Sequence, residues 1–232
     1  MSIHGRILPI RLFFALFSLL SISIFSSTGA RAGDHDTTPT TDAEWLLCEG
    51  KCSVTLFSGL FLKTDISEVL GVEGKFTPPW RYKWGQSVNL EVAFAREVYR
   101  YEDMFRFELE VGAGQRFGVF HDQEFWVALY GRWTKFPWND RVKTTIAVST
   151  GLDYATTSPL WERSASGQSQ GSHLMHYLSP EVTFADPANP NLELVFRLQH
   201  RSGGRHYWGN TTLFNSTGAG IQYGMVGIRY HF

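Results

Sequence analysis

Apolar and polar side chains alternate along most of the chain beyond residue 52. The clearest example is the segment FRFELEVG at 105–112, in which Phe, Phe, Leu and Val occupy every second position and Arg and Glu lie between them. A period of two places the two sets on opposite faces of a β-strand, and helical spacing does not fit them. Eight segments of this kind predict strands: 53–63, 89–101, 105–112, 124–136, 143–154, 176–185, 192–202 and 220–232.

The connections between these strands alternate in length. Short connections follow the second, fourth and sixth strands (102–104, 137–142, 186–191), long ones follow the first, fifth and seventh (64–87, 155–175, 203–219), and the third is intermediate (118–123). Outer-membrane barrels have short periplasmic turns at one end and longer extracellular loops at the other. We therefore expect an all-β fold, an antiparallel up-and-down transmembrane β-barrel of eight strands. Ten strands is the alternative if 64–87 contains a hairpin.

A soluble secreted β-sandwich would also have alternating strands. Three features favour the barrel. One face of each strand is apolar and the other carries Glu, Arg and Gln, as a lipid-facing wall and a polar lumen require. The chain ends in GMVGIRYHF, an alternating strand closed by an aromatic residue. Aromatic residues also crowd the strand ends, where interfacial girdles lie: Trp80, Trp84, Tyr99, Tyr101, Trp133, Trp138, Tyr207 and Trp208.

The first 32 residues have the pattern of a secretory signal. Arg6 and Arg11 precede an apolar stretch over 12–25, and an A-x-A cleavage site ends at Ala32. The stretch is shorter than the roughly 20 residues that a transmembrane helix needs. The expected domains are a signal peptide at 1–32, a periplasmic segment at 33–52 and an outer-membrane barrel at 53–232. Because export exposes Cys48 and Cys52 to an oxidising compartment, we expect them to form a disulfide.

Charge and composition exclude several classes of function. The segment 33–232 holds 18 basic and 22 acidic residues, a net charge of about −4, which argues against a nucleic-acid partner. An eight-stranded barrel fills its interior with side chains, which disfavours a pore. His173 and His176 are three residues apart and so point to opposite faces of a strand, and we expect neither a metal nor a cofactor. Glu91, Glu97, Glu108 and Glu110 predict a lumen salt-bridge network with the nearby Arg96, Arg100 and Arg106.

The strongest candidate for a catalytic site lies at the end of the seventh predicted strand, NLELVFRLQHRS. Leu and Phe occupy positions 192, 194, 196 and 198, and the same parity carries His200 and Ser202 onto the lipid face near the extracellular end. Side chains two apart on a strand project side by side, about 6 to 7 Å apart. The imidazole can then serve as general base for the hydroxyl. The alternative is that the strand has already left the membrane and both residues begin a wet loop.

The His200-Arg201-Ser202 motif, the Gly- and Asn-rich loop after it and the aromatic C-terminus resemble the PagL-like lipid A 3-O-deacylases, also called acyloxyacyl hydrolases. The resemblance covers 174–232, and 53–173 by architecture alone. It implies an eight-stranded outer-membrane barrel with His200 as base and Ser202 as nucleophile. The family's Asn after the serine is Gly203 here, whose N–H with that of Gly204 could hold an oxyanion. The family's acid aligns with Gln222, which shares outward parity with Phe232.

The sequence thus supports two functions. The first is an outer-membrane lipid esterase that hydrolyses an ester-linked acyl chain of lipid A, or of another outer-leaflet lipid. The second is a non-catalytic barrel with a structural or surface-binding role, in which the missing acid marks lost catalysis. A homodimer stays an open alternative to a monomer.

Overall fold

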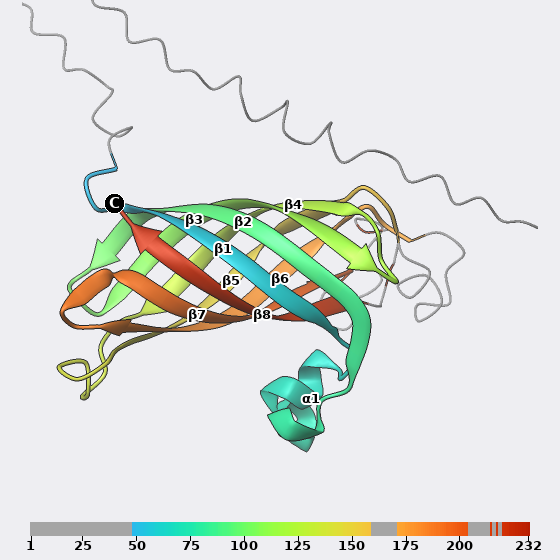
Figure 1. Cartoon of the computed structure of the whole chain (residues 1–232), viewed down its shortest axis with the longest axis horizontal. Helices are drawn as coiled ribbons and strands as arrows, with labels where there is room; N and C mark the ends of the chain where they lie inside the picture. The colour runs from blue at the N-terminus through green and yellow to red at the C-terminus, as the bar shows by residue number, and fades with distance from the viewer. Residues whose placement is uncertain (1–47, 159–170, 204–213, 215–216, 218–219) are drawn as a thin grey trace, which may run out of the picture. The chain divides into compact units, whose positions relative to one another are not determined.

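The chain forms a closed antiparallel barrel of eight strands in sequence order, with β8 completing the ring against β1 (Figure 1). The structure, a computed structural model, describes residues 48–158, 171–203, 214, 217 and 220–232. The strands are β1 (Cys52–Leu62), β2 (Trp84–Tyr101), β3 (Phe105–Gly118), β4 (Gln123–Trp133), β5 (Lys143–Ala155), β6 (Leu174–Asp186), β7 (Asn189–Ser202) and β8 (Gly220–His231). The predicted fold class and the number of strands are confirmed.

The strands differ from the prediction at their ends. β3 continues to Gly118 because its second half pairs with the start of β2, where Ser87 faces Gly118. The turn between β6 and β7 is shorter than predicted and consists of Pro187 and Ala188. The segment 64–87 contains no hairpin: it holds the short helix α1 (Ile66–Leu70), two 3-10 turns, η4 (Val72–Gly74) and η5 (Pro79–Arg81), and the start of β2. The ten-strand alternative is therefore wrong.

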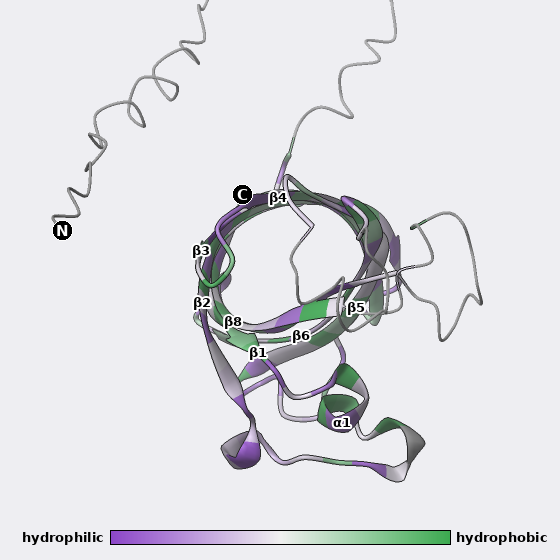
Figure 2. Cartoon of the chain, turned by 90° about the vertical axis from the view of Figure 1, so that its right-hand side faces the viewer, coloured by the Kyte–Doolittle hydropathy of each residue, from purple (hydrophilic) through white to green (hydrophobic). Residues whose placement is uncertain are grey.

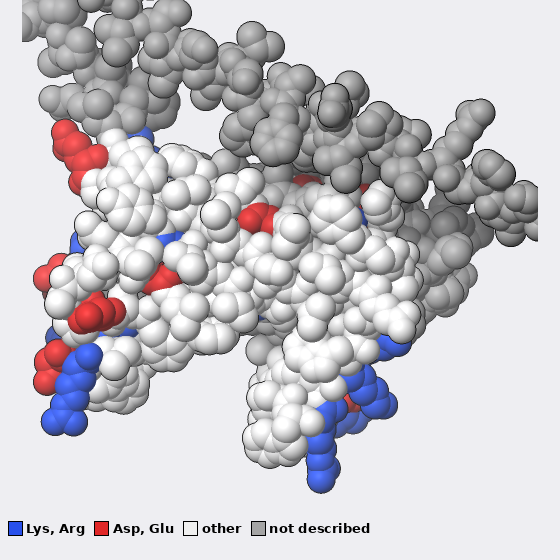
Figure 3. Space-filling view, in the orientation of Figure 1, with Lys and Arg blue, Asp and Glu red and all other residues white. Residues whose placement is uncertain are grey.

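The outer wall of the barrel is apolar on every strand. Large exposed hydrophobic side chains include Leu56, Val92, Leu109, Val127, Val148, Phe184, Phe196 and Ile228, one from each strand in turn. In Figure 3 the charged groups crowd one end of the barrel and the segment that projects beside the other end, while the wall between them is almost uncharged. Such a wall is stable against lipid rather than water, so the barrel spans a membrane, as outer-membrane barrels do. No helix within the described residues is long and apolar enough to cross a membrane.

The interior is charged, and its centre is Glu181 of β6. Its carboxylate forms ion pairs with Arg132 of β4 at 2.8 Å, Arg197 of β7 at 2.7 Å and Arg229 of β8 at 2.8 Å. Arg197 also pairs with Glu110 at 2.7 Å, and all of these side chains are buried. Because each charge is neutralised by partners on other strands, the network holds opposite walls of the barrel together.

The predicted lumen network exists, but with different arginines. Glu108 pairs with Arg132 at 2.9 Å, and only the more distant Arg106 comes from the predicted set. Arg100 is half-exposed and pairs with Glu97 near the end of β2. The prediction took cations from neighbouring positions in the sequence, whereas a closed barrel brings them from across the lumen.

A compact segment, residues 63–83, projects from the side of the barrel at the end of β1; we call it the lateral arm (Figures 1 and 2). Asp65 caps α1 by accepting a hydrogen bond from the Ser67 N–H at 2.8 Å, and Gly71 ends the helix at a positive φ of 70°. The Thr77 N–H then donates to the Glu68 carbonyl at 2.9 Å, which folds the arm back on itself.

Candidate functional site

His200 and Ser202 lie at the end of β7, beyond its lipid-facing residues. Leu194 and Phe196 are exposed on the outer wall, and Glu193, Arg197 and Gln199 are buried in the lumen, as the alternation predicts. His200 has the same parity as Leu194 but is only 8% exposed, whereas Ser202 is half-buried. At this end of β7 the histidine is therefore covered, whereas Ser202 remains partly accessible.

Gln222 of β8 contacts His200 and determines which nitrogen of its imidazole carries the proton. The two residues face each other in the β7–β8 ladder, and Nδ1 of His200 lies 3.0 Å from Oε1 of Gln222. The other end of the amide, Nε2, donates to the carbonyl of Thr64 at the base of the lateral arm. Because a carbonyl only accepts, the Thr64 contact requires the NH₂ of Gln222 and leaves its oxygen toward the imidazole. His200 must then carry its proton on Nδ1, and its Nε2 keeps a lone pair.

Gly220 creates the space in which His200 and Ser202 meet. A Cβ at position 220 would lie 2.8 Å from Cε1 of His200 and 2.8 Å from Cβ of Ser202. Both side chains thus lie close to the same glycine, which pairs with Ser202 in the β7–β8 ladder. Among the described residues no hydrogen bond joins Ser202 to His200. Catalytic hydrogen bonds are often long before substrate binds, so the arrangement suits a base and a nucleophile.

A second histidine lies on the other side of Ser202. His176 of β6 is the cross-strand partner of Ser202, and its Nε2 lies 2.9 Å from the hydroxyl of Thr150 on β5. The spacing in the sequence groups His176 only with His173, as a possible metal pair. His173 instead donates through Nδ1 to the Ala155 carbonyl at 2.8 Å. No spacing in the sequence indicated that His176 adjoins Ser202, because that contact depends on the β6–β7 register.

The described part of the chain contains no group of three His, Cys, Asp or Glu side chains that could hold a metal ion. Of the two glycines predicted to hold an oxyanion, Gly204 lies outside the described residues. Gly203 is buried beside Thr217, whose carbonyl leaves no space for a Cβ there. This packing accounts for the glycine, and the oxyanion role stays a prediction.

Cys48 and Cys52 form a disulfide at the opposite end of the barrel. Cys52 also begins β1 and exchanges two backbone hydrogen bonds with Phe232, the last residue. The predicted signal at 1–32 and most of the segment 33–52 lie outside the described residues.

No family model matches the chain, and no curated protein matches it. Similar solved structures include the following three. The outer membrane enzyme PagL has 12% identity and a TM-score of 0.49, covering 77% of this chain and 98% of its own. Neisserial surface protein A has 12% identity and a TM-score of 0.47, covering 79% and 97%. The outer membrane protein Ail of Yersinia pestis has 14% identity and a TM-score of 0.31, covering 78% and 99%.

Proposed function

We propose that this outer-membrane barrel is a lipid esterase resembling the lipid A 3-O-deacylases, with Ser202 as nucleophile and His200 as general base. The observation that carries the proposal is the chain of contacts from Thr64 through Gln222 to His200. It holds the imidazole in the tautomer that can accept a proton from a serine hydroxyl.

The reaction is ester hydrolysis in two steps. Nε2 of His200 takes the proton of Ser202 as the hydroxyl oxygen attacks the ester carbonyl, and the resulting tetrahedral oxyanion is held by backbone N–H groups after Ser202. The histidine then protonates the departing alcohol, which leaves an acyl group on Ser202. Water, deprotonated by the same imidazole, releases the fatty acid and regenerates the serine.

The position of the site supports a lipid substrate. His200 and Ser202 continue the parity of Leu194 and Phe196, whose side chains are exposed on the apolar wall. An ester in the outer leaflet can approach Ser202 from the side, with its acyl chain along that wall. A water-soluble ester would have to displace lipid first.

One observation favours the second function, a barrel without catalysis. The group that orients His200 is a neutral amide, which cannot stabilise the imidazolium as a carboxylate does. A site of this construction would be slow, which suits a barrel with a structural or surface-binding role.

The two functions are separated by mass spectrometry of lipid A from cells with and without the protein, and by fatty-acid release from lipid A by purified protein in detergent. We expect slow release by the native chain and none by Ser202→Ala or His200→Ala. The matched control is Ser58→Ala, because Ser58 is an exposed residue of β1 outside the site. If the native protein releases no more fatty acid than a protein-free sample, the proposal is wrong and the non-catalytic barrel stands. Equal release above that level by the native protein and Ser202→Ala would show that Ser202 is not the nucleophile.

A further inference from the structure

Several large apolar side chains are exposed on the lateral arm. Trp80 is 83% exposed and Phe76 is 66% exposed, and Leu70 and Val72 are also exposed. Large apolar side chains are thus exposed to the surroundings on one short segment. Aromatic rings of this kind are enriched at the boundary between lipid and water.

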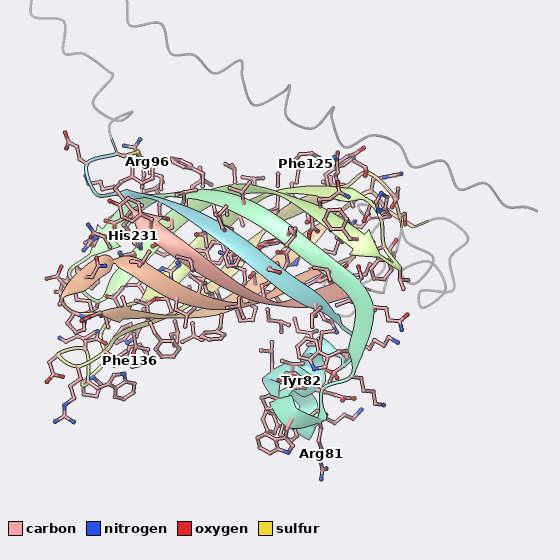
Figure 4. All side chains as sticks on the ribbon, in the orientation of Figure 1. Arg81, Tyr82, Arg96, Phe125, Phe136 and His231 are labelled. Carbon is pink, nitrogen blue, oxygen red and sulfur yellow. A yellow bond between two sulfur atoms is a disulfide. The ribbon has the colours of Figure 1, made fainter. Side chains whose placement is uncertain are left out.

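The charged side chains of the arm gather on one side of it. In Figure 3 the side of the arm that is turned toward the middle of the barrel is uncharged, and Lys and Arg lie on the opposite side and at the tip. Figure 4 shows Arg81 at that tip, extending away from the barrel. The exposed basic residues of the arm are Lys63, Lys75, Arg81 and Lys83.

Two of the three acidic residues of the arm accept hydrogen bonds within it. Asp65 accepts from the backbone and the hydroxyl of Ser67, and Glu68 accepts from the hydroxyl of Thr77 at 2.9 Å. The arm is also tied at its base, where the Lys63 N–H donates to the Lys83 carbonyl at 2.8 Å. The arm is therefore an ordered element whose four basic residues are exposed and outnumber its three acidic residues by one.

From these observations we propose that the lateral arm lies on the outer-leaflet surface and binds the phosphate groups of anionic lipid. It leaves the barrel at the end opposite the short turns, which is the extracellular end in outer-membrane barrels, and projects sideways from the wall (Figures 1 and 2). Phe76 and Trp80 enter the lipid surface, and Lys75 and Arg81 contact the phosphates above it. The proposal rests on the membrane-spanning fold and is independent of the esterase.

The depth of the arm can be measured with one label. Trp80→Cys, made in the Ser202→Ala background so that lipid is not cleaved, takes a thiol-reactive fluorophore because both native cysteines are in a disulfide. The protein is reconstituted in nanodiscs of phosphatidylcholine doped with lipid A. The control label is at Asp103→Cys, in the β2–β3 turn, whose side chain is fully exposed at the other end of the barrel.

We expect the label at position 80 to be quenched several-fold more by lipid carrying a shallow nitroxide than by aqueous iodide, with the reverse at position 103. If iodide quenches both labels equally, the arm stands in water and the proposal fails. Phe76→Cys repeats the measurement with Trp80 intact. Neither result depends on ester hydrolysis, so the esterase proposal is unaffected.

The phosphate contacts are tested by energy transfer from a label at position 80 to fluorescent lipid A. We expect Lys75→Gln with Arg81→Gln to lower the transfer several-fold. The charge-matched control is Lys135→Gln with Lys143→Gln, two exposed lysines at the opposite end. Equal transfer in the two double variants would overturn the assignment of a phosphate-binding arm.

Discussion

Nδ1 of His200 and the amide oxygen of Gln222 lie 3.0 Å apart on directly opposed positions of β7 and β8. In a serine hydrolase this place is taken by a carboxylate, which accepts from the histidine and carries charge. The amide here performs the first task and also donates to Thr64, which a carboxylate could not do.

Gln222→Glu tests the balance of these two effects. The change loses the donation to Thr64, which costs about 1–3 kcal/mol, or roughly ten- to a hundred-fold in the population of the correct arrangement. It gains a charge next to the imidazolium, and the reverse change from acid to amide costs about 10⁴ in rate. We expect Gln222→Glu to raise fatty-acid release and Gln222→Leu to lower it. If Glu has no effect on a fast native enzyme, the orienting group is another residue.

His200 and His176 both adjoin Ser202, and the proposed mechanism assigns them different roles. Loss of a general base costs about 10²–10⁴ in rate, so we expect His200→Ala to lose that much. Nε2 of His176 is engaged with Thr150, and we expect His176→Ala to stay within about tenfold of the native rate. The measurement is fatty-acid release by the two variants, with folding checked by heat-modifiable gel migration. The opposite order would make His176 the base.

A charge on the lipid face should cost more than the same charge in a loop. Val111 is exposed in the middle of β3, and Val119 is exposed just after that strand ends. Lys costs about 2–4 kcal/mol near the bilayer midplane and about 0–1 kcal/mol near the interface. We therefore expect Val111→Lys to destabilise the barrel in lipid vesicles by that larger amount and Val119→Lys to leave it nearly unchanged. Equal effects would contradict the assignment of the outer wall.

Glu181→Gln removes one charge from the centre of the lumen. Three buried arginines lose a partner, and breaking a buried ion pair costs about 3–5 kcal/mol. Glu97→Gln is the control, because Glu97 pairs with the half-exposed Arg100 and such pairs are worth about 0–1 kcal/mol. Urea unfolding in vesicles measures both. If Glu181→Gln lowers the free energy of unfolding no more than Glu97→Gln does, lumen water or the other acidic residues neutralise the arginines.

Alternation alone predicts the eight strands and their two faces because each strand lies between lipid and a polar lumen. The lateral arm was expected to be a loop or a hairpin. The residues that indicate its turns are local: Asp65 at the helix cap, Gly71 after the helix and the Pro78-Pro79 pair. None of them indicates that the base of the arm contacts β8. The link between Thr64 and Gln222 joins residues 158 positions apart, so only the closure of the barrel brings them together.

The sequence predicts only part of the candidate site, because the rest depends on contacts between strands. His200, Ser202 and Gln222 were named from parity and from resemblance, and the structure brings them to one end of the β7–β8 ladder. The contact between His176 and Ser202 could not be predicted, because a change of one residue in the turn at 187–188 would alter the β6–β7 register. Likewise, no local pattern in the sequence indicates the packing inside the lumen of Phe61 with Phe120 and Tyr223.

The position of Glu181 also limits the order in which the strands can enter the lipid. Its arginine partners come from β4, β7 and β8, so the carboxylate is fully neutralised only when the last strand is in place. A hairpin of β5 and β6 inserted alone would hold that charge in hydrocarbon without any of these three partners. We therefore expect the strands to cross the bilayer together, as a sheet that has already curved around its own charges.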